Sequence, residues 1–139
     1  MDLAAAFADL HRVAWPELGH AHGPADDVPG LLRAATGADE EAAAEAEEEL
    51  WSSLVHQGTP YEATVAAAPF LACFAAAGVR RANLLGMLGA VAESADEHSL
   101  DQPGAARAAA VAQLPLMLVI HNDSEFRVVA RRVLADLAR

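Results

Sequence analysis

A short polar stretch near the middle of the chain, residues 56–62, has the residue types that can do chemistry. An imidazole beside a carboxylate can bind a ligand or move a proton, and a phenol or an amide can hold a substrate by hydrogen bonds. The candidate side chains are His56, Gln57, Tyr61 and Glu62. If two helices meet at this stretch, these side chains line the groove between them, where a small ligand or a partner's backbone would bind.

The same stretch also has a purely structural explanation, which we favour. Thr59-Pro60-Tyr61-Glu62 matches the capping box that starts many helices, with proline at the first helical position. In that arrangement the Thr59 hydroxyl accepts from the Glu62 backbone N–H, and the Glu62 carboxylate accepts from the Thr59 N–H. His56 then lies in the last turn of the preceding helix, where a positive charge is favourable. We therefore predict no catalytic residues and expect that the protein is not an enzyme.

Three histidines in the first part of the chain raise the question of a metal site. His11, His20 and His22 are accompanied by Asp26 and Asp27, and imidazole and carboxylate are both zinc ligands. A zinc site needs about four ligands that converge at defined spacing, whereas His20 and His22 form a lone His-x-His pair without a cysteine partner. We interpret the segment as a solvated loop and predict no metal ion and no cofactor.

Other signatures of catalysis are missing from the sequence. None of the serines lies in a Gly-x-Ser-x-Gly elbow, and there is no glycine-rich phosphate loop. The single cysteine, Cys73, cannot form an internal disulfide, and it sits among Phe70, Leu71 and Phe74. We expect it to be a buried and unreactive thiol.

The net charge of −11 is concentrated in the N-terminal part of the chain. Residues 1–62 contain thirteen acidic residues and two arginines, whereas the charges of residues 63–139 balance. Residues 39–49 contain seven acidic residues, and helical spacing directs Glu45, Glu48 and Glu49 away from the apolar side of their helix. Such a run is usually a solvated helix face. The functional alternative is a docking face for a basic protein.

The acidic balance also argues against two classes of partner. An acidic surface repels nucleic acid and anionic membranes. A local basic stripe of Arg127, Arg131, Arg132 and Arg139 on the last helix is the one feature that favours DNA. We expect a basic protein as the partner, and neither nucleic acid nor a membrane.

Composition indicates a single all-α domain over residues 1–139. Hydrophobic residues make up 54% of the chain, most of them alanine, and aromatic residues only 5%. Alanine favours helix, and too few residues alternate for a sheet. The uncharged run of residues 63–79 is short, rich in alanine and contains Pro69, so it predicts a buried helix instead of a membrane span. With an acidic residue in Met1-Asp2-Leu3 in place of a basic signal start, we expect a cytoplasmic protein.

Periodicity and stop signals predict six or seven helices. We expect a loop over residues 15–29, Asp39 as an N-cap, and interior prolines at Pro69 and Pro115. The predicted helices cover residues 2–12, a short segment from Asp26 or Asp27 to Gly37, then 39–57, 59–77, 80–95, 103–120 and 122 onward. The very short connections between the later helices favour antiparallel neighbours.

Two segments are similar to a known repeat family. Residues 122–137, with Asp123, the Phe126-Arg127 pair and Leu137, resemble the second helix of a HEAT repeat. Residues 51–71 look like a motif of uncharacterised bacterial, particularly actinobacterial, HEAT-like proteins. The resemblance covers residues 39–139 and implies a short right-handed α-solenoid of antiparallel helix pairs. Residues 1–38 match no family and are expected to be an irregular N-terminal portion.

HEAT-like folds imply a scaffold or binding role. We therefore expect a protein-interaction module that binds a basic partner. About three helix pairs are near the minimum for a stable stack, so self-association that covers an end is a further expectation. The alternatives are a small-ligand-binding or enzymatic protein that uses His56, Tyr61 and Glu62, and an immunity-type protein that neutralises a toxin. A deep cavity at those three side chains would favour the former.

Overall fold

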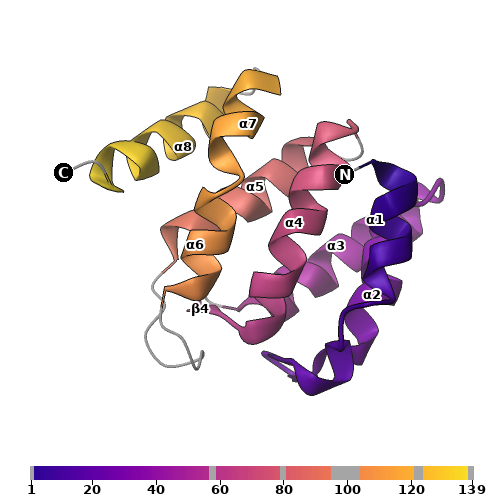
Figure 1. Cartoon of the computed structure of the whole chain (residues 1–139). Coiled ribbons are helices and arrows are strands. Elements are labelled where there is room, and N and C mark those ends of the chain that lie inside the picture. Colours follow the sequence, from indigo (N-terminus) through magenta and orange to yellow (C-terminus); the bar gives the residue numbers. More distant parts are fainter. Residues whose placement is uncertain (1, 57–58, 79–80, 95–103, 121–123, 138–139) are drawn as a thin grey trace.

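The computed structural model describes residues 2–56, 59–78, 81–94, 104–120 and 124–137, and their regular structure is almost entirely helical (Figure 1). The helices are α1 (Leu3–Leu10), α2 (Val28–Ala35), α3 (Glu40–Leu54), α4 (Glu62–Ala76), α5 (Arg81–Glu93), α6 (Ala105–Val111), α7 (Leu114–Ile120) and α8 (Ser124–Leu137). Two 3-10 turns are η1 (Trp15–Glu17) and η2 (Ala25–Asp27). The short strands are β1 (Gly19–His20), β2 (Gly23–Pro24), β3 (Val55–His56) and β4 (Thr59–Pro60). The all-α class is confirmed.

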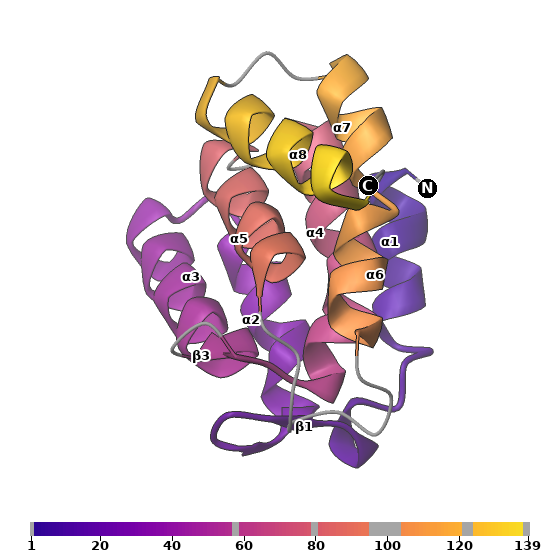
Figure 2. The same ribbon diagram turned by 90° about the vertical axis from the view of Figure 1, so that its left-hand side faces the viewer.

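The helices form two layers around α4. In Figure 2, α3 and α5 lie on the left of α4, α1 and α6 lie on its right, and α8 crosses above α5 toward α6. Helix α4 packs against α1, α5 and α6, and α5 packs in turn against α8. The hydrophobic core is continuous from Ala6 on α1 to Val133 on α8.

Helix α4 is the buried helix predicted from its uncharged run. Ala63, Ala67, Leu71 and Phe74 are fully buried, because alanines leave room for helices to approach on several sides. Cys73 is half-buried, and burial raises the pKa of its thiol, which disfavours the reactive thiolate. In the described part of the chain, no helix has the length and apolar character needed to cross a bilayer.

Helix α3 begins as predicted. The Asp39 carboxylate accepts hydrogen bonds from the backbone N–H groups of Glu41 and Ala42, at 3.1 and 3.2 Å, and so satisfies two donors that have no partner inside the helix. The apolar side expected for this helix is a buried stripe that consists of Ala43, Ala46, Leu50 and Leu54.

The boundary between α3 and α4 differs from the prediction. Helix α3 ends at Leu54, and Val55 and His56 form a strand that pairs with Thr59 and Pro60. The predicted capping box of Thr59 and Glu62 is therefore wrong, and so is the placement of His56 in a helical turn. Gln57 and Gly58 lie outside the described residues.

Thr64 performs the capping function instead. Helix α4 starts at Glu62, and the Tyr61 N–H donates to the Thr64 hydroxyl at 2.9 Å. The same hydroxyl donates to the carbonyl of Leu54 at 2.5 Å. One fully buried side chain thus joins the end of α3 to the start of α4.

The predicted helix over residues 103–120 is interrupted. Helix α6 ends at Val111, and α7 begins at Leu114 with Pro115 as its second residue. Pro115 has no N–H to donate to the Val111 carbonyl, and its ring crowds that carbonyl. Pro69 faces the same problem yet lies inside an unbroken α4. Pro103 and residues 121–123 lie outside the described residues.

The N-terminal portion is more ordered than predicted. Trp15 is buried, and its indole N–H donates to the Leu10 carbonyl at 2.8 Å. The centroid of its ring lies 6.2 Å from that of the Phe70 ring. Strands β1 and β2 form a small hairpin, and the Ala21 N–H at its tip donates to the Ser53 carbonyl at 3.0 Å. The segment predicted as a solvated loop therefore packs on α3 and α4.

Candidate functional site

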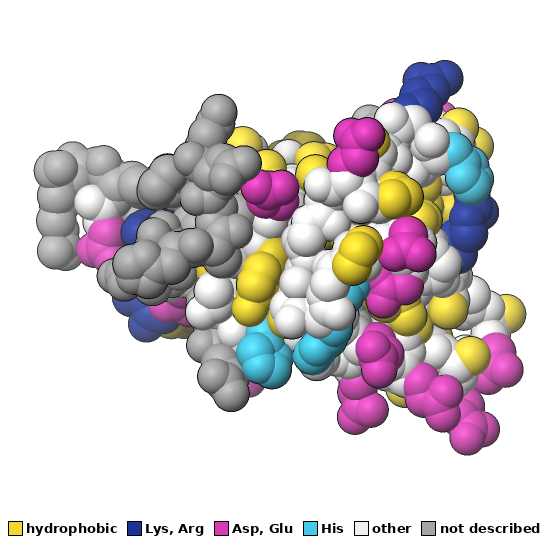
Figure 3. Space-filling view, turned by 90° about the horizontal axis from the view of Figure 1, so that it is seen from below, with side chains coloured by type: hydrophobic (Ala, Val, Ile, Leu, Met, Phe, Trp, Pro, Cys, Tyr) yellow, Lys and Arg dark blue, Asp and Glu magenta, His cyan; other side chains and the backbone are white. Residues whose placement is uncertain are grey.

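Two hairpins from distant parts of the chain bring three histidines together. The ring centroids of His22 and His56 lie 5.6 Å apart with one ring edge-on to the other, and those of His20 and His22 lie 6.0 Å apart. Histidine side chains gather on the underside of the molecule in Figure 3. We call His20, His22 and His56 the histidine row.

His20 has a structural role in this row. Its Nδ1 accepts the His22 backbone N–H at 3.0 Å, and its Nε2 lies 2.8 Å from Asp27 Oδ1. The tautomer protonated at Nε2 satisfies both contacts, because Nδ1 then accepts while Nε2–H donates to the carboxylate. The side chain is 4% exposed, so both nitrogens are occupied and shielded.

The five residues considered for a metal site do not converge. His22 Nε2 lies 2.8 Å from the Ser52 hydroxyl, while His11 Nε2 accepts from Arg33 Nη2 at 2.6 Å. Among the described residues, no three His, Cys, Asp or Glu side chains are arranged to hold a metal ion. Instead, the His22–Ser52 hydrogen bond joins the hairpin to α3, and the His11–Arg33 hydrogen bond joins the end of α1 to α2.

The predicted groove residues occupy one corner of the fold. His56 ends β3, Tyr61 precedes α4, and Glu62 is the first residue of α4; all three are half-buried. Gln57 lies outside the described residues. The contact partner of His56 is His22, which the sequence did not indicate because 34 positions separate them. The grooves between α4 and α7 and between α5 and α8 lie away from this corner.

Helix α3 exposes the three acidic side chains expected from the sequence, Glu45, Glu48 and Glu49, and it exposes Glu41 as well. Glu41, Glu45, Glu48 and Glu49 are exposed, and acidic side chains gather over α3 at the lower edge of Figure 3. None of these four forms an ion pair with another described residue. We call these four residues the acidic face.

One glutamate of the same helix behaves differently. Glu47 is buried, and its carboxylate accepts from the Asn83 side-chain amide at 2.9 Å, which joins α3 to α5. This pair was not predicted from the sequence. The burial of Glu47 could have been inferred from its position on the helix, because it directly follows Ala46 of the buried stripe.

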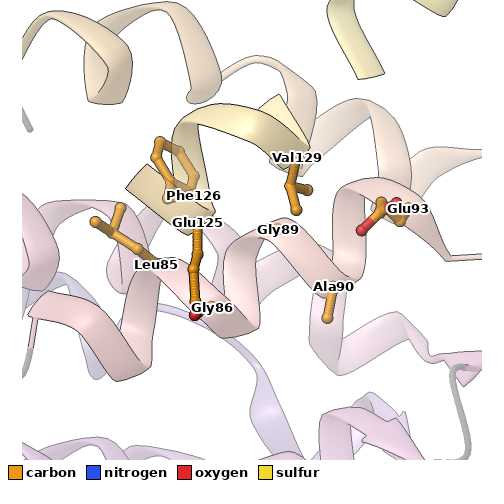
Figure 4. A pocket seen from close by; sticks show the side chains of 8 residues that line it. All are labelled: Leu85, Gly86, Gly89, Ala90, Glu93, Glu125, Phe126 and Val129. Atoms are coloured by element: carbon orange, nitrogen blue, oxygen red, sulfur yellow. The ribbon is translucent and has the colours of Figure 1, made fainter. Parts of the chain in front are cut away.

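A groove of about 220 Å³ runs between α5 and α8 (Figure 4). Gly86 and Gly89 form its floor, with Phe126 and Val129 of α8 beside them. At Gly89 the helices approach closely, since an added Cβ would lie 3.3 Å from Val129 Cγ1. At Gly86 an added Cβ would meet nothing within 4 Å, so this part of the floor is open. We call this the α5–α8 groove.

Carboxylates stand at the two ends of the α5–α8 groove. Figure 4 shows the Glu125 side chain extending toward Gly86 and Glu93 beside Ala90 at the other end. Glu93 forms an ion pair with Arg132, whereas Glu125 has no partner among the described residues.

Comparison of the chain with protein-family models, with curated proteins and with solved structures finds no match.

Proposed function

We propose that the chain is a cytoplasmic protein-interaction module, a short α-solenoid of the HEAT type that binds a basic protein. The packing order supports this proposal. Helix α2 packs on α3, α4 packs on α5, and α6 and α8 then add to α4 and α5. The Glu47–Asn83 hydrogen bond joins the α2–α3 pair to the α4–α5 pair, and helix pairs that are joined in chain order are typical of solenoids.

The observation that carries the binding proposal is the unneutralised charge of the acidic face. Glu45 has Glu41 and Glu49 four residues away and Glu48 three residues away on the same exposed side. Like charges at this spacing destabilise a helix by about 0.2–0.5 kcal/mol per pair. A cationic partner would remove this repulsion and would be drawn to the face by its field.

A pull-down with matched variants tests the proposal. Immobilised protein is compared with the variant Glu45→Gln/Glu49→Gln and with the control Glu17→Gln/Asp26→Asn, which removes two exposed charges elsewhere. We expect basic proteins to be retained by the unmodified chain and the control, and to be lost in the α3 variant and at about 0.5 M salt. If the amount of basic protein retained changes neither with salt nor with the α3 substitutions, the proposal is contradicted.

The alternatives from the sequence have less support. A ligand-binding or enzymatic protein would need a cavity at His56, Tyr61 and Glu62, and the grooves beside α5 and α7 lie elsewhere. An immunity-type protein is a special case of the proposed function, with a toxin as the basic partner. A specific toxin retained in the pull-down would favour it.

A further inference from the structure

The α5–α8 groove has the size of one amino-acid side chain. Its volume is about 220 Å³, which is below the range of roughly 300–1,000 Å³ typical of pockets for cofactors and drug-sized ligands. Its open floor at Gly86 and its wall of Phe126 and Val129 are apolar. A groove of this size and lining suits an aliphatic side chain that anchors a larger interface.

The charges at the ends of the groove determine which residues of the bound segment are favoured next to the inserted side chain. The Glu125 carboxylate stands at the Gly86 end without a partner among the described residues, while Glu93 is held by Arg132 at the other end. A cationic residue beside the inserted side chain gains a partner at Glu125, whereas an acidic residue meets repulsion.

We propose that the α5–α8 groove binds a leucine-like side chain of a basic segment, with an adjacent arginine or lysine on Glu125. The proposal rests on the proposed function, because it gives the basic partner a second contact beyond the acidic face. The acidic face lies on α3 and the groove on α5 and α8, and the Glu47–Asn83 hydrogen bond joins α3 to α5.

Three synthetic peptides serve as probes: Arg-Arg-Leu-Arg-Arg, Arg-Arg-Ser-Arg-Arg and Glu-Glu-Leu-Glu-Glu. Binding is followed by the amide chemical shifts of the isotope-labelled protein at low salt. We expect the leucine peptide with arginines to move the signals of Gly86, Gly89 and Val129. The serine peptide should move only signals of α3, and the acidic peptide should move neither set.

A groove-filling variant provides the structural test. Gly86→Phe places a ring in the open floor of the groove. We expect the Kd obtained from the groove signals to rise at least tenfold. Gly30→Phe is the matched control, because Gly30 also lies in a helix with nothing within 4 Å of an added Cβ. Glu125→Gln should weaken binding of the arginine–leucine peptide, with Glu17→Gln as its control.

The outcomes separate the two proposals. If both arginine peptides move only α3 signals, the groove proposal is overturned and the acidic face stands. If Gly86→Phe and Gly30→Phe behave alike, the groove is not the site of insertion. If neither arginine peptide moves any α3 signal, the proposed function fails as well. Retained α3 shifts in Gly86→Phe also show that this variant is folded.

Discussion

At the scale of single residues, Thr64 is the most informative side chain. Its hydroxyl accepts from the Tyr61 N–H and donates to the Leu54 carbonyl, although Thr64 itself is fully buried. A buried hydrogen-bonding group that loses its partner costs about 1–3 kcal/mol. The hydroxyl therefore stabilises the junction at which the polar residues Tyr61 and Glu62 are placed.

We expect Thr64→Val to lower the free energy of unfolding by about 1–3 kcal/mol, because valine keeps the shape but leaves two backbone groups without their partner. Urea denaturation measures the change. Thr36→Val is the control, since the Thr36 hydroxyl bonds Leu32 at the half-exposed end of α2, where water can replace it. Equal effects at the two positions would contradict the role given to Thr64.

The two glycines of α5 should respond differently to alanine. Gly86→Ala adds a methyl group in open space and should raise the free energy of unfolding by about 0.5–1 kcal/mol, because alanine favours helix. Gly89→Ala places the methyl group 3.3 Å from Val129 Cγ1, so the neighbouring helix must shift and the gain should shrink or reverse. Thermal unfolding of the pair measures the difference. Equal stabilisation would mean that α5 and α8 are not in close contact at Gly89.

At the scale of elements, α3 combines a stabilising N-cap with a repulsive surface. Asp39 caps the helix, whereas Glu45 lies beyond the first turn and has three like-charged neighbours at i±3 or i±4. The dipole therefore favours the first acidic residues of α3 but gives Glu45 little benefit. This repulsion is consistent with the proposed docking face, because charges kept for binding often lower the stability of the free protein.

Glu45→Gln should stabilise the free protein by about 0.5–1 kcal/mol at low salt, because it removes up to three repulsive pairs. The gain should disappear at about 1 M salt, where the Debye length is only about 3 Å. Urea titrations at the two salt concentrations measure both effects. A loss of stability at low salt would show that Glu45 has a cationic neighbour and that the acidic face is not unneutralised.

At the scale of the whole molecule, the neighbouring helices α7 and α8 expose apolar side chains. On α7 and α8, Leu116, Val119 and Val128 are 55%, 84% and 63% exposed. A group of exposed apolar side chains on neighbouring helices is typical of a surface that contacts another protein. These exposed residues support the expectation of self-association.

We expect the protein to form dimers or larger assemblies at micromolar concentration, and Val119→Ser/Val128→Ser to make it monomeric. Sedimentation equilibrium measures both. Trp51→Ser is the control, because Trp51 is the exposed apolar residue of α3 and does not belong to this group. A monomer at every concentration tested would contradict the expectation.

Features that depend on residues within one or two helical turns could be predicted from the sequence. The Asp39 cap and the buried stripe of α3 were predicted, because backbone N–H groups and helical periodicity are local. The acidic face followed for the same reason. The identity of the partner could not be predicted, because charge indicates only the class of partner.

Contacts between residues that are distant in the sequence form only in the tertiary structure. The different effects of the two prolines on their helices also depend on it. His22 meets His56, Thr64 bonds Leu54, and Glu47 bonds Asn83 only after the helices and hairpins pack. Pro69 and Pro115 remove the same type of hydrogen bond, yet α4 continues through one and the helix breaks at the other. Packing against α1, α5 and α6 holds the buried α4 together, whereas α7 exposes Leu116 and Val119 to solvent. The energy of a local defect is set by the neighbours that surround it, and those neighbours are specified only in three dimensions.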